Sequence, residues 1–305
     1  MAKPNLLSLY FIVSLLSLII ACNADASKGN HEFSYLKDSL NGPTKWGSLG
    51  AQFKSCSDGE SQSPINIEAK KAKDQPYDLK KSYKEAPAKL FNRDHAITVE
   101  WQGDAGGIEV NGTAYQLFQC HWHIPSEHTI NGKKHDAEIH FVHIDGNDQK
   151  AVIGYLYTIG KADPFIEKLS ESKLEAIDSN GNALGKISAS SATSGSKKYY
   201  RYRGSLTTPP CSEGVTWTVA DTTKSISKEQ IELLKGPLDH GFKENARPVQ
   251  ELRGRTVTKF EDKEETGEGK QCGKDSSSSI IHPRNGIIII LIHIYVLLLF
   301  YVVAF

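Results

Sequence analysis

Short β-rich runs separated by tight-turn dipeptides constrain the fold of this 305-residue chain more than any other feature. Alternating or continuously apolar runs occupy residues 96–101, 114–124, 136–144 and 151–158. Asn111-Gly112 and Asn131-Gly132 lie between them, and Asn-Gly is typical of two-residue hairpin turns. The pattern predicts a mostly β domain.

Two short helices are indicated outside these runs. Asp163 is a capping residue followed by Pro164, and proline is favoured in the first turn of a helix. Ser227 stands before a helical pattern with Gln230 at the capping-box position. The fold class we expect is therefore mostly β with short helices, that is, α+β.

The N-terminal residues 1–26 have the features of a secretory signal peptide. A lysine precedes an apolar run at 6–21, and small residues follow it. Cleavage after Ala26 fits an A-x-A pattern, and cleavage after Ala24 is a close alternative. Residues 19–22 also loosely resemble a bacterial lipoprotein box, which we rank lower because of the opposite end of the chain.

The C-terminal residues 278–305 have the features of a GPI-anchor signal. The run 287–305 is almost wholly apolar, and no lysine or arginine follows it. A charged, serine-rich stalk is expected at 261–277, which leaves 27–260 as one domain. The anchor-attachment candidates are Ser276, Ser277 and Ser278. We expect the protein on the extracellular face of the cell membrane; a secreted form or a single C-terminal transmembrane anchor is the alternative.

The charge balance excludes one class of partner. Lysine plus arginine number 36 and aspartate plus glutamate number 36, so the chain lacks the basic surface of a general nucleic-acid binder. An extracellular chain can also form disulfides among its cysteines. Asn111 begins an N-x-T tripeptide and is a candidate glycosylation site.

A set of histidines in the predicted strands suggests a metal site. Because side chains alternate in a strand, Gln119, His121 and His123 share one face. Glu138 and His140 share a face of the run 136–144. If these strands are antiparallel neighbours, three imidazoles converge, and Gln119 and Glu138 can orient the rings.

Three neutral histidines leave the full charge on zinc and one coordination position open. That combination lowers the pKa of a bound water to about 7. Spacing alone does not exclude His128, His135 or His143 as ligands. We interpret His143 as a packed, hydrogen-bonded core residue and His135 as a loop residue.

Several motifs resemble the α-class carbonic anhydrases. These are SQSPINI at 61–67, NRDHAITVEW at 92–101, QCHWH at 119–123, SEHT at 126–129, SLTTPP at 205–210 and NARPVQ at 245–250. The similarity runs from about residue 33 to 256 in the expected order. With the two terminal signals, the chain resembles the secreted, GPI-anchored members.

The resemblance implies a single domain around a large, twisted, mainly antiparallel central sheet of about ten strands. It implies Zn²⁺ held by His121, His123 and His140. Glu127 and Thr207 match the pair that orients the zinc-bound hydroxide, and His95 matches the proton shuttle.

The resemblance also assigns roles to residues around this centre. The carbon dioxide site is implied to comprise Val142, Val152, Leu206, Thr207, Thr208 and Trp217. The supporting groups are implied to be Tyr35, Gln119, Glu138 and Asn245. Cys56 and Cys211 match the disulfide of extracellular members. Arg93 departs from the usual asparagine, and we expect its charge to lower the pKa of His95.

The implied function is zinc-dependent, reversible hydration of carbon dioxide to bicarbonate and a proton at the cell surface. An extracellular binding or adhesion module with little activity is the alternative, and zinc esterase activity is a third hypothesis. The expected ligands are carbon dioxide, bicarbonate, and sulfonamide or anion inhibitors. We expect a lipid anchor to attach the protein to the membrane, and we expect the protein to be a monomer.

Overall fold

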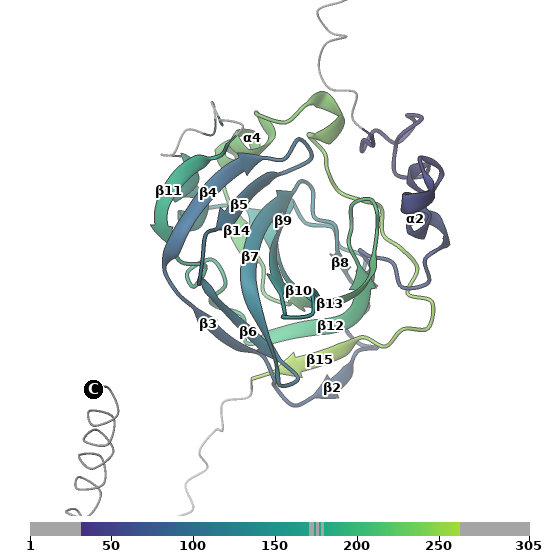
Figure 1. Ribbon diagram of the computed structural model, residues 1–305. Coiled ribbons are helices and arrows are strands. Elements are labelled where there is room, and N and C mark those ends of the chain that lie inside the picture. Colours follow the sequence, from purple (N-terminus) through teal and green to yellow (C-terminus); the bar gives the residue numbers. More distant parts are fainter. Residues whose placement is uncertain (1–31, 171–173, 175–176, 178–179, 263–305) are drawn as a thin grey trace, which may run out of the picture. The chain divides into compact units, whose positions relative to one another are not determined.

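A 13-stranded mixed sheet forms the centre of the domain (Figure 1). The computed structural model describes residues 32–170, 174, 177 and 180–262. The described residues form fifteen strands, of which β1 and β8 pair in a separate two-stranded sheet. The strands are β1 (Asn66–Ile67), β2 (Lys73–Gln75), β3 (Lys80–Tyr83), β4 (Ala86–Asn92), β5 (Ile97–Trp101), β6 (Gly106–Val110), β7 (Thr113–His123), β8 (Thr129–Ile130), β9 (Ala137–Ile144), β10 (Lys150–Ile159), β11 (Asn182–Ile187), β12 (Lys198–Ser205), β13 (Glu213–Ala220), β14 (Lys224–Ile226) and β15 (Thr258–Glu261).

The main path of the sheet is β11-β4-β5-β7-β9-β10-β13-β12-β15-β2, with β14 beside β10 and β6 joining β3 to β7. Most pairs are antiparallel, but β10–β13, β10–β14 and β15–β2 are parallel. The predicted mostly β fold is confirmed. The sheet is mixed, however, and has more strands than expected, because short edge strands such as β2 and β14 are too brief to give a periodic pattern.

Among the described residues the helices are few and short, as predicted. They are α2 (Ser55–Asp58), α3 (Pro164–Ser170), α4 (Lys228–Lys235) and the 3₁₀ helices η1 (Trp46–Ser48), η2 (Ala51–Phe53) and η4 (His240–Phe242). The predicted capping box is present, because the Ser227 hydroxyl accepts from the Gln230 N–H and the Gln230 side chain accepts from the Ser227 N–H.

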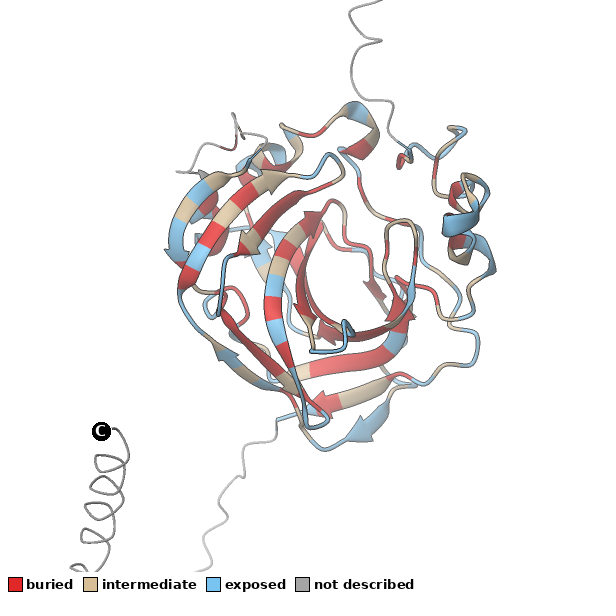
Figure 2. Cartoon of the chain, viewed as in Figure 1, coloured by how far each residue is buried: buried red, intermediate tan, exposed pale blue. Residues whose placement is uncertain are grey.

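The sheet separates two groups of buried apolar side chains. The larger includes Cys120 and Trp122 of β7, whereas the smaller includes Val142, Val152 and Trp217. Figure 2 shows the central strands as largely buried and the edge strand β2 as exposed. Strands buried on both faces give a rigid floor on which side chains can be positioned accurately.

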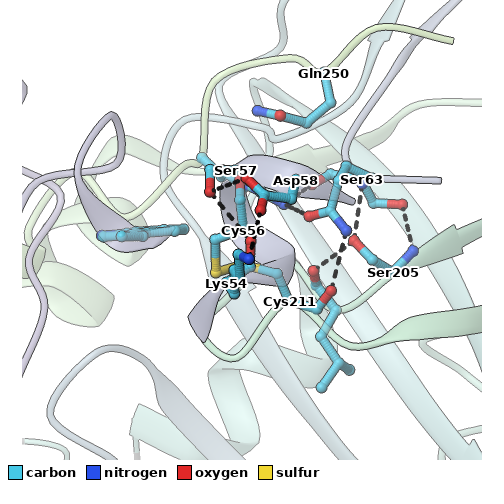
Figure 3. The surroundings of a disulfide bond; sticks show 12 residues. Lys54, Cys56, Ser57, Asp58, Ser63, Ser205, Cys211 and Gln250 are labelled. Atoms are coloured by element: carbon cyan, nitrogen blue, oxygen red, sulfur yellow. Dashed lines mark hydrogen bonds and ion pairs between the residues drawn. A yellow bond between two sulfur atoms is a disulfide. The ribbon is translucent and has the colours of Figure 1, made fainter. Parts of the chain in front are cut away.

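The Cys56–Cys211 disulfide predicted from the resemblance is present (Figure 3). It closes a loop with a sequence separation of 155 residues, which in the chain-entropy treatment contributes about 5 kcal/mol. The bond ties α2 to the loop after β12, where the Cys211 N–H donates to the Thr208 carbonyl. Cys120 is a buried free thiol.

The predictions for the two ends of the chain concern residues that lie outside the described ranges. These are the signal peptide at 1–26, the anchor signal at 278–305 and almost all of the stalk at 261–277. Contacts divide the chain into Met1–Lys263 and Glu264–Phe305. Within the described residues, no helix has the length and apolar character needed to cross a membrane.

Candidate metal centre

Three histidines come together on adjacent strands. His121 and His123 lie on β7, His140 lies on β9, and the antiparallel register pairs His121 with His140. Their candidate ligand nitrogens all lie within 4.8 Å of one another. The alternation of side chains along β7 and β9 thus predicts which histidines meet once the register is known.

A β-bulge in β7 gives the histidines this orientation. The pairing with β9 shifts between Leu117 and Gln119, so Phe118 is the extra residue. Leu117 and Cys120 both enter the core although they are three positions apart, which requires such a shift in the alternation. Phe118 and Gln119 consequently both line the cavity above the histidines.

One nitrogen of each ring is fixed by a hydrogen bond to an oxygen. His121 Nδ1 lies 2.9 Å from Gln119 Oε1. His123 Nδ1 lies 2.7 Å from the Asn245 carbonyl. His140 Nε2 lies 2.8 Å from Glu138 Oε1. These oxygens accept hydrogen bonds, so each ring carries its proton on that nitrogen and leaves the other nitrogen free as a ligand.

The electrostatics favour neutral rings. Burial is the largest cause that lowers the pKa of His121 and His140, and it lowers the pKa of His123 to about 4. The neighbouring histidines lower the pKa of His121 further. Neutral imidazole is the form that binds a metal, so no proton has to be displaced at neutral pH.

Two buried atoms at the centre, a candidate ligand nitrogen and a carboxylate oxygen, have no hydrogen-bond partner of ordinary geometry among the described residues. They are His123 Nε2 and Glu127 Oε2, which lie 3.6 Å apart. Unpaired buried polar atoms are costly. Three free imidazole nitrogens are a donor set that Zn²⁺ prefers in catalytic sites, so the residues present fit a zinc ion.

A second cluster, His128 with Glu138 and His140, is better explained as a hydrogen-bond network. Glu138 Oε1 accepts from His128 Nδ1 and His140 Nε2, at 2.7 and 2.8 Å. Its Oε2 accepts from the N–H groups of Glu127 and His128. Although burial raises the pKa of Glu138, the two histidines hold it well below its usual value. All its acceptor positions are used, so it orients His140.

Glu127 lies beside the histidines, fully buried. Its Oε1 accepts from the Arg247 N–H at 2.8 Å. Burial raises the pKa of Glu127 to about 7, and His140, the Thr207 hydroxyl and the Arg247 N–H oppose this rise. A nearby dication would lower this pKa, because opposite charge favours the carboxylate.

A cavity of about 470 Å³ opens above the metal centre. One side is apolar, with Val142, Val152, Leu206 and Trp217. The Trp217 N–H donates to the Ser205 carbonyl at 2.9 Å, so that N–H is already satisfied by the protein. Thr207 and Thr208 also line the cavity.

His95 lies in the turn between β4 and β5 and lines the same cavity. Burial lowers the pKa of His95 to about 4, and His123 is the next largest cause of that lowering. The Arg93 charge acts in the expected direction but is the smallest of the stated causes. Tyr35 is buried, its hydroxyl lacks a described partner, and burial raises its pKa.

Some residues of the site had no assigned role in the sequence. Arg247 is buried and donates to Gln62, to the Ser63 carbonyl and to the Cys56 carbonyl. His128 Nε2 lies 2.7 Å from the Tyr202 hydroxyl. Arg247 falls in the quoted motif at 245–250, but a single sequence does not reveal that its main-chain N–H holds Glu127.

Comparison with known proteins places this arrangement in a family. The eukaryotic-type carbonic anhydrase profile matches residues 41–261. Alpha carbonic anhydrase 4 of Arabidopsis thaliana is 42% identical over 228 residues, which cover 74% of this chain and 84% of that protein.

Solved structures agree. Dioscorin complexed with ascorbate superposes with a TM-score of 0.73 at 35% identity, over 76% of this chain and 98% of that one. The Thermovibrio ammonificans α-carbonic anhydrase, in complex with sulfanilamide, has a TM-score of 0.67 at 34% identity, over 75% of this chain and 100% of that one. From its profile match, its relatives and its fold, this chain belongs to the eukaryotic-type, or α-type, carbonic anhydrase family.

Proposed function

We propose that this protein hydrates carbon dioxide reversibly to bicarbonate and a proton, with Zn²⁺ held by His121, His123 and His140. The observation that carries the proposal is the convergence of three histidine ring nitrogens within 4.8 Å of one another, beside a cavity with an apolar side that His121 and His140 line. When bound, zinc with three neutral histidines lowers the pKa of a water to about 7 and so supplies a nucleophile at neutral pH.

The apolar side of the cavity holds the substrate. Carbon dioxide has no hydrogen to donate and is weakly polar, so Val142, Val152 and Leu206 offer it surface without competing hydrogen bonds. His121 and His140 line the same cavity, so the proposed metal site and the substrate surface would hold the two reactants together. This positioning replaces an encounter in solution.

Glu127 and Thr207 set the direction of the hydrogen bonds. Since the Arg247 N–H occupies Oε1 of Glu127, Oε2 remains to accept the proton of the Thr207 hydroxyl beside it. Thr207 Oγ1 must then accept a hydrogen bond from the cavity. Ligands with a proton to donate are thereby favoured over those without one.

We expect the proposed activity to appear directly in stopped-flow hydration assays on the protein. Wild type should accelerate hydration, a strong zinc chelator should abolish the acceleration, and added zinc should restore it. Sulfanilamide should inhibit, as a relative binds it. Stoichiometric zinc without hydration would instead favour the alternative, a binding module with little activity.

We propose that His95 transfers the released proton to buffer. It is half-buried at the cavity wall, and its ring nitrogens can take up a proton and pass it on. Because burial lowers the pKa of His95 to about 4, the protonated ring gives its proton up readily to buffer at neutral pH. His95→Ala should lower kcat by about tenfold at low buffer concentration, with kcat/KM for carbon dioxide nearly unchanged. Adding imidazole should restore turnover; equal rates at every buffer concentration would remove this role.

We propose that the protein acts at the extracellular face of the membrane, with a glycan at Asn111. Asn111 and Gly112 form the exposed turn between β6 and β7, at the end of β7 opposite His123. Phospholipase C treatment of expressing cells should release the protein, and Asn111→Gln should remove a glycosidase-sensitive mass. Retention after phospholipase treatment would favour a transmembrane tail. We further propose that the protein is a monomer.

A further inference from the structure

We propose that Arg93 is a positioning residue that fixes the turn carrying His95, through a clamp formed by Arg93, Phe91 and Glu100. This inference rests on the proposed role of His95 as a proton shuttle. The clamp lines the rim of the cavity, since Arg93 and Glu100 both line it.

The turn itself is tight and already under a local restraint. It joins β4 to β5 after the pair Asn92–Ile97. The Arg93 N–H donates to the Ala96 carbonyl at 3.0 Å, and the His95 N–H donates to the Arg93 carbonyl at 2.7 Å. Asp94 has a φ of 62°, a conformation that L-residues adopt at some cost. Such a turn needs contacts on both flanks to keep one geometry.

One flank is tied to the metal centre. The Asn245 side-chain amide donates to the His95 carbonyl at 2.8 Å. The carbonyl of the same asparagine accepts from His123 Nδ1 at 2.7 Å. His123 and the His95 backbone therefore share Asn245 as a partner. The Asn92 side chain adds a second restraint, since it accepts from the Asp94 N–H and donates to the Pro237 carbonyl, both at 2.9 Å.

Arg93 ties the turn to β5 through Glu100. Its Nε donates to Glu100 Oε1 at 3.0 Å, and its Nη2 donates to the same oxygen. The guanidinium carbon also lies 4.0 Å from the centre of the Phe91 ring. A Cβ on Gly181 would lie 2.4 Å from the Phe91 ring, so the ring is itself packed against backbone. The guanidinium is thus held in its own plane by the hydrogen bonds to Glu100 and on one face by the Phe91 ring.

This clamp differs from an ordinary surface ion pair. Fully exposed ion pairs contribute little to stability, but Glu100 has only 17% of its side chain exposed, compared with 43% for Arg93. Glu100 also pairs with Gln119 across β5 and β7, and Gln119 orients His121. Removing Arg93 should loosen the turn while the sheet stays folded. Proton transfer depends steeply on distance, so turnover should respond.

The kinetic test compares Arg93→Ala and Arg93→Lys with the matched control Arg253→Ala. Arg253 forms a similar pair with Glu60 at 2.7 Å, with side-chain exposures of 40% and 75%, outside the turn. Arg93→Ala should lower kcat by about fivefold at low buffer, with kcat/KM unchanged and imidazole restoring turnover. Arg93→Lys should be intermediate, because lysine keeps the charge without the planar fork. Arg253→Ala should match wild type.

A second measurement does not depend on zinc or activity. In metal-free protein, NMR should detect the His95 ring beside Phe33, since the ring centres lie 5.9 Å apart. Arg93→Ala should weaken that contact and speed exchange of the His95 amide by about tenfold, whereas Arg253→Ala should change neither.

The outcomes separate this inference from the proposed function. If Arg93→Ala keeps the ring contact and the amide protection, the positioning role is overturned whatever the activity. It is also overturned if kcat at low buffer is unchanged while His95→Ala lowers it. If wild type hydrates no carbon dioxide, or if His95→Ala has no buffer-dependent defect, the proposed function or shuttle fails. The NMR comparison then still decides whether Arg93 fixes the turn.

Discussion

Replacing His121 with alanine should give a folded protein that no longer holds zinc stoichiometrically and no longer hydrates carbon dioxide. Two histidines would remain, and Zn²⁺ in catalytic sites has three protein ligands. Losing an outer hydrogen-bond partner typically costs 10–100-fold in metal affinity. Losing a ligand itself should therefore cost more than about 100-fold.

His121 is a cleaner choice than His140 for this experiment. The Nδ1 of His121 is bonded only to Gln119, a neutral residue that lines the cavity. His140 instead shares the buried carboxylate of Glu138 with His128. Removing His140 would take away one hydrogen-bond donor of that buried carboxylate. The substitution would then lower the stability of the fold as well as the affinity for zinc.

The measurement is the zinc-to-protein ratio after dialysis against a zinc buffer, followed by stopped-flow hydration. Gln119→Ala serves as a graded control, because it removes only the partner that orients His121; its zinc affinity should fall by about tenfold. Circular dichroism and urea unfolding report whether each variant folds. Zinc retained at full stoichiometry in His121→Ala would contradict the proposed ligand set and point to the cluster of His128, Glu138 and His140.

The periodic part of the structure could be predicted from the sequence. Strand alternation put His121 and His123 on one face, and the structure buries Cys120 and Trp122, which alternate with them along β7, in the larger core. The interpretation of His143 as a core residue is also confirmed, since it is buried and its ring nitrogens lie within hydrogen-bond distance of Tyr83 and the Ala151 carbonyl. These predictions needed only local spacing.

Contacts between distant segments could not be predicted in this way. The partner of His123 is the backbone carbonyl of Asn245, 122 positions away, and a carbonyl has no side-chain signature. The bulge at Phe118 leaves the sequence pattern ambiguous, because a one-residue insertion changes which face each side chain occupies. The parallel pairing of β10 with β13 depends on the crossover between them.

Replacing Thr207 with valine should slow hydration strongly while zinc stays bound. Valine keeps the shape of threonine but has no hydroxyl. No group at this position could then donate to Glu127 and accept a hydrogen bond from a ligand in the cavity. Losing one such positioned group typically costs 10²–10³-fold in rate, and we expect a fall of about 100-fold in kcat/KM. Thr208→Val is the matched control, because Thr208 lines the same cavity; its effect should be much smaller.

Glu127→Gln should lower kcat/KM by about the same factor as Thr207→Val, because it reverses the direction of one hydrogen bond. The glutamine can still accept from the Arg247 N–H, as Glu127 does at 2.8 Å. Its amide group, however, would donate toward Thr207, and Thr207 would then donate into the cavity rather than accept from it. Thr207→Val and Glu127→Gln disrupt the same hydrogen-bonded pair. The double variant should therefore be no slower than either single variant. Multiplied losses in the double variant, with zinc content unchanged, would show that the two residues act separately and that the Glu127–Thr207 pair does not set the hydrogen-bond direction.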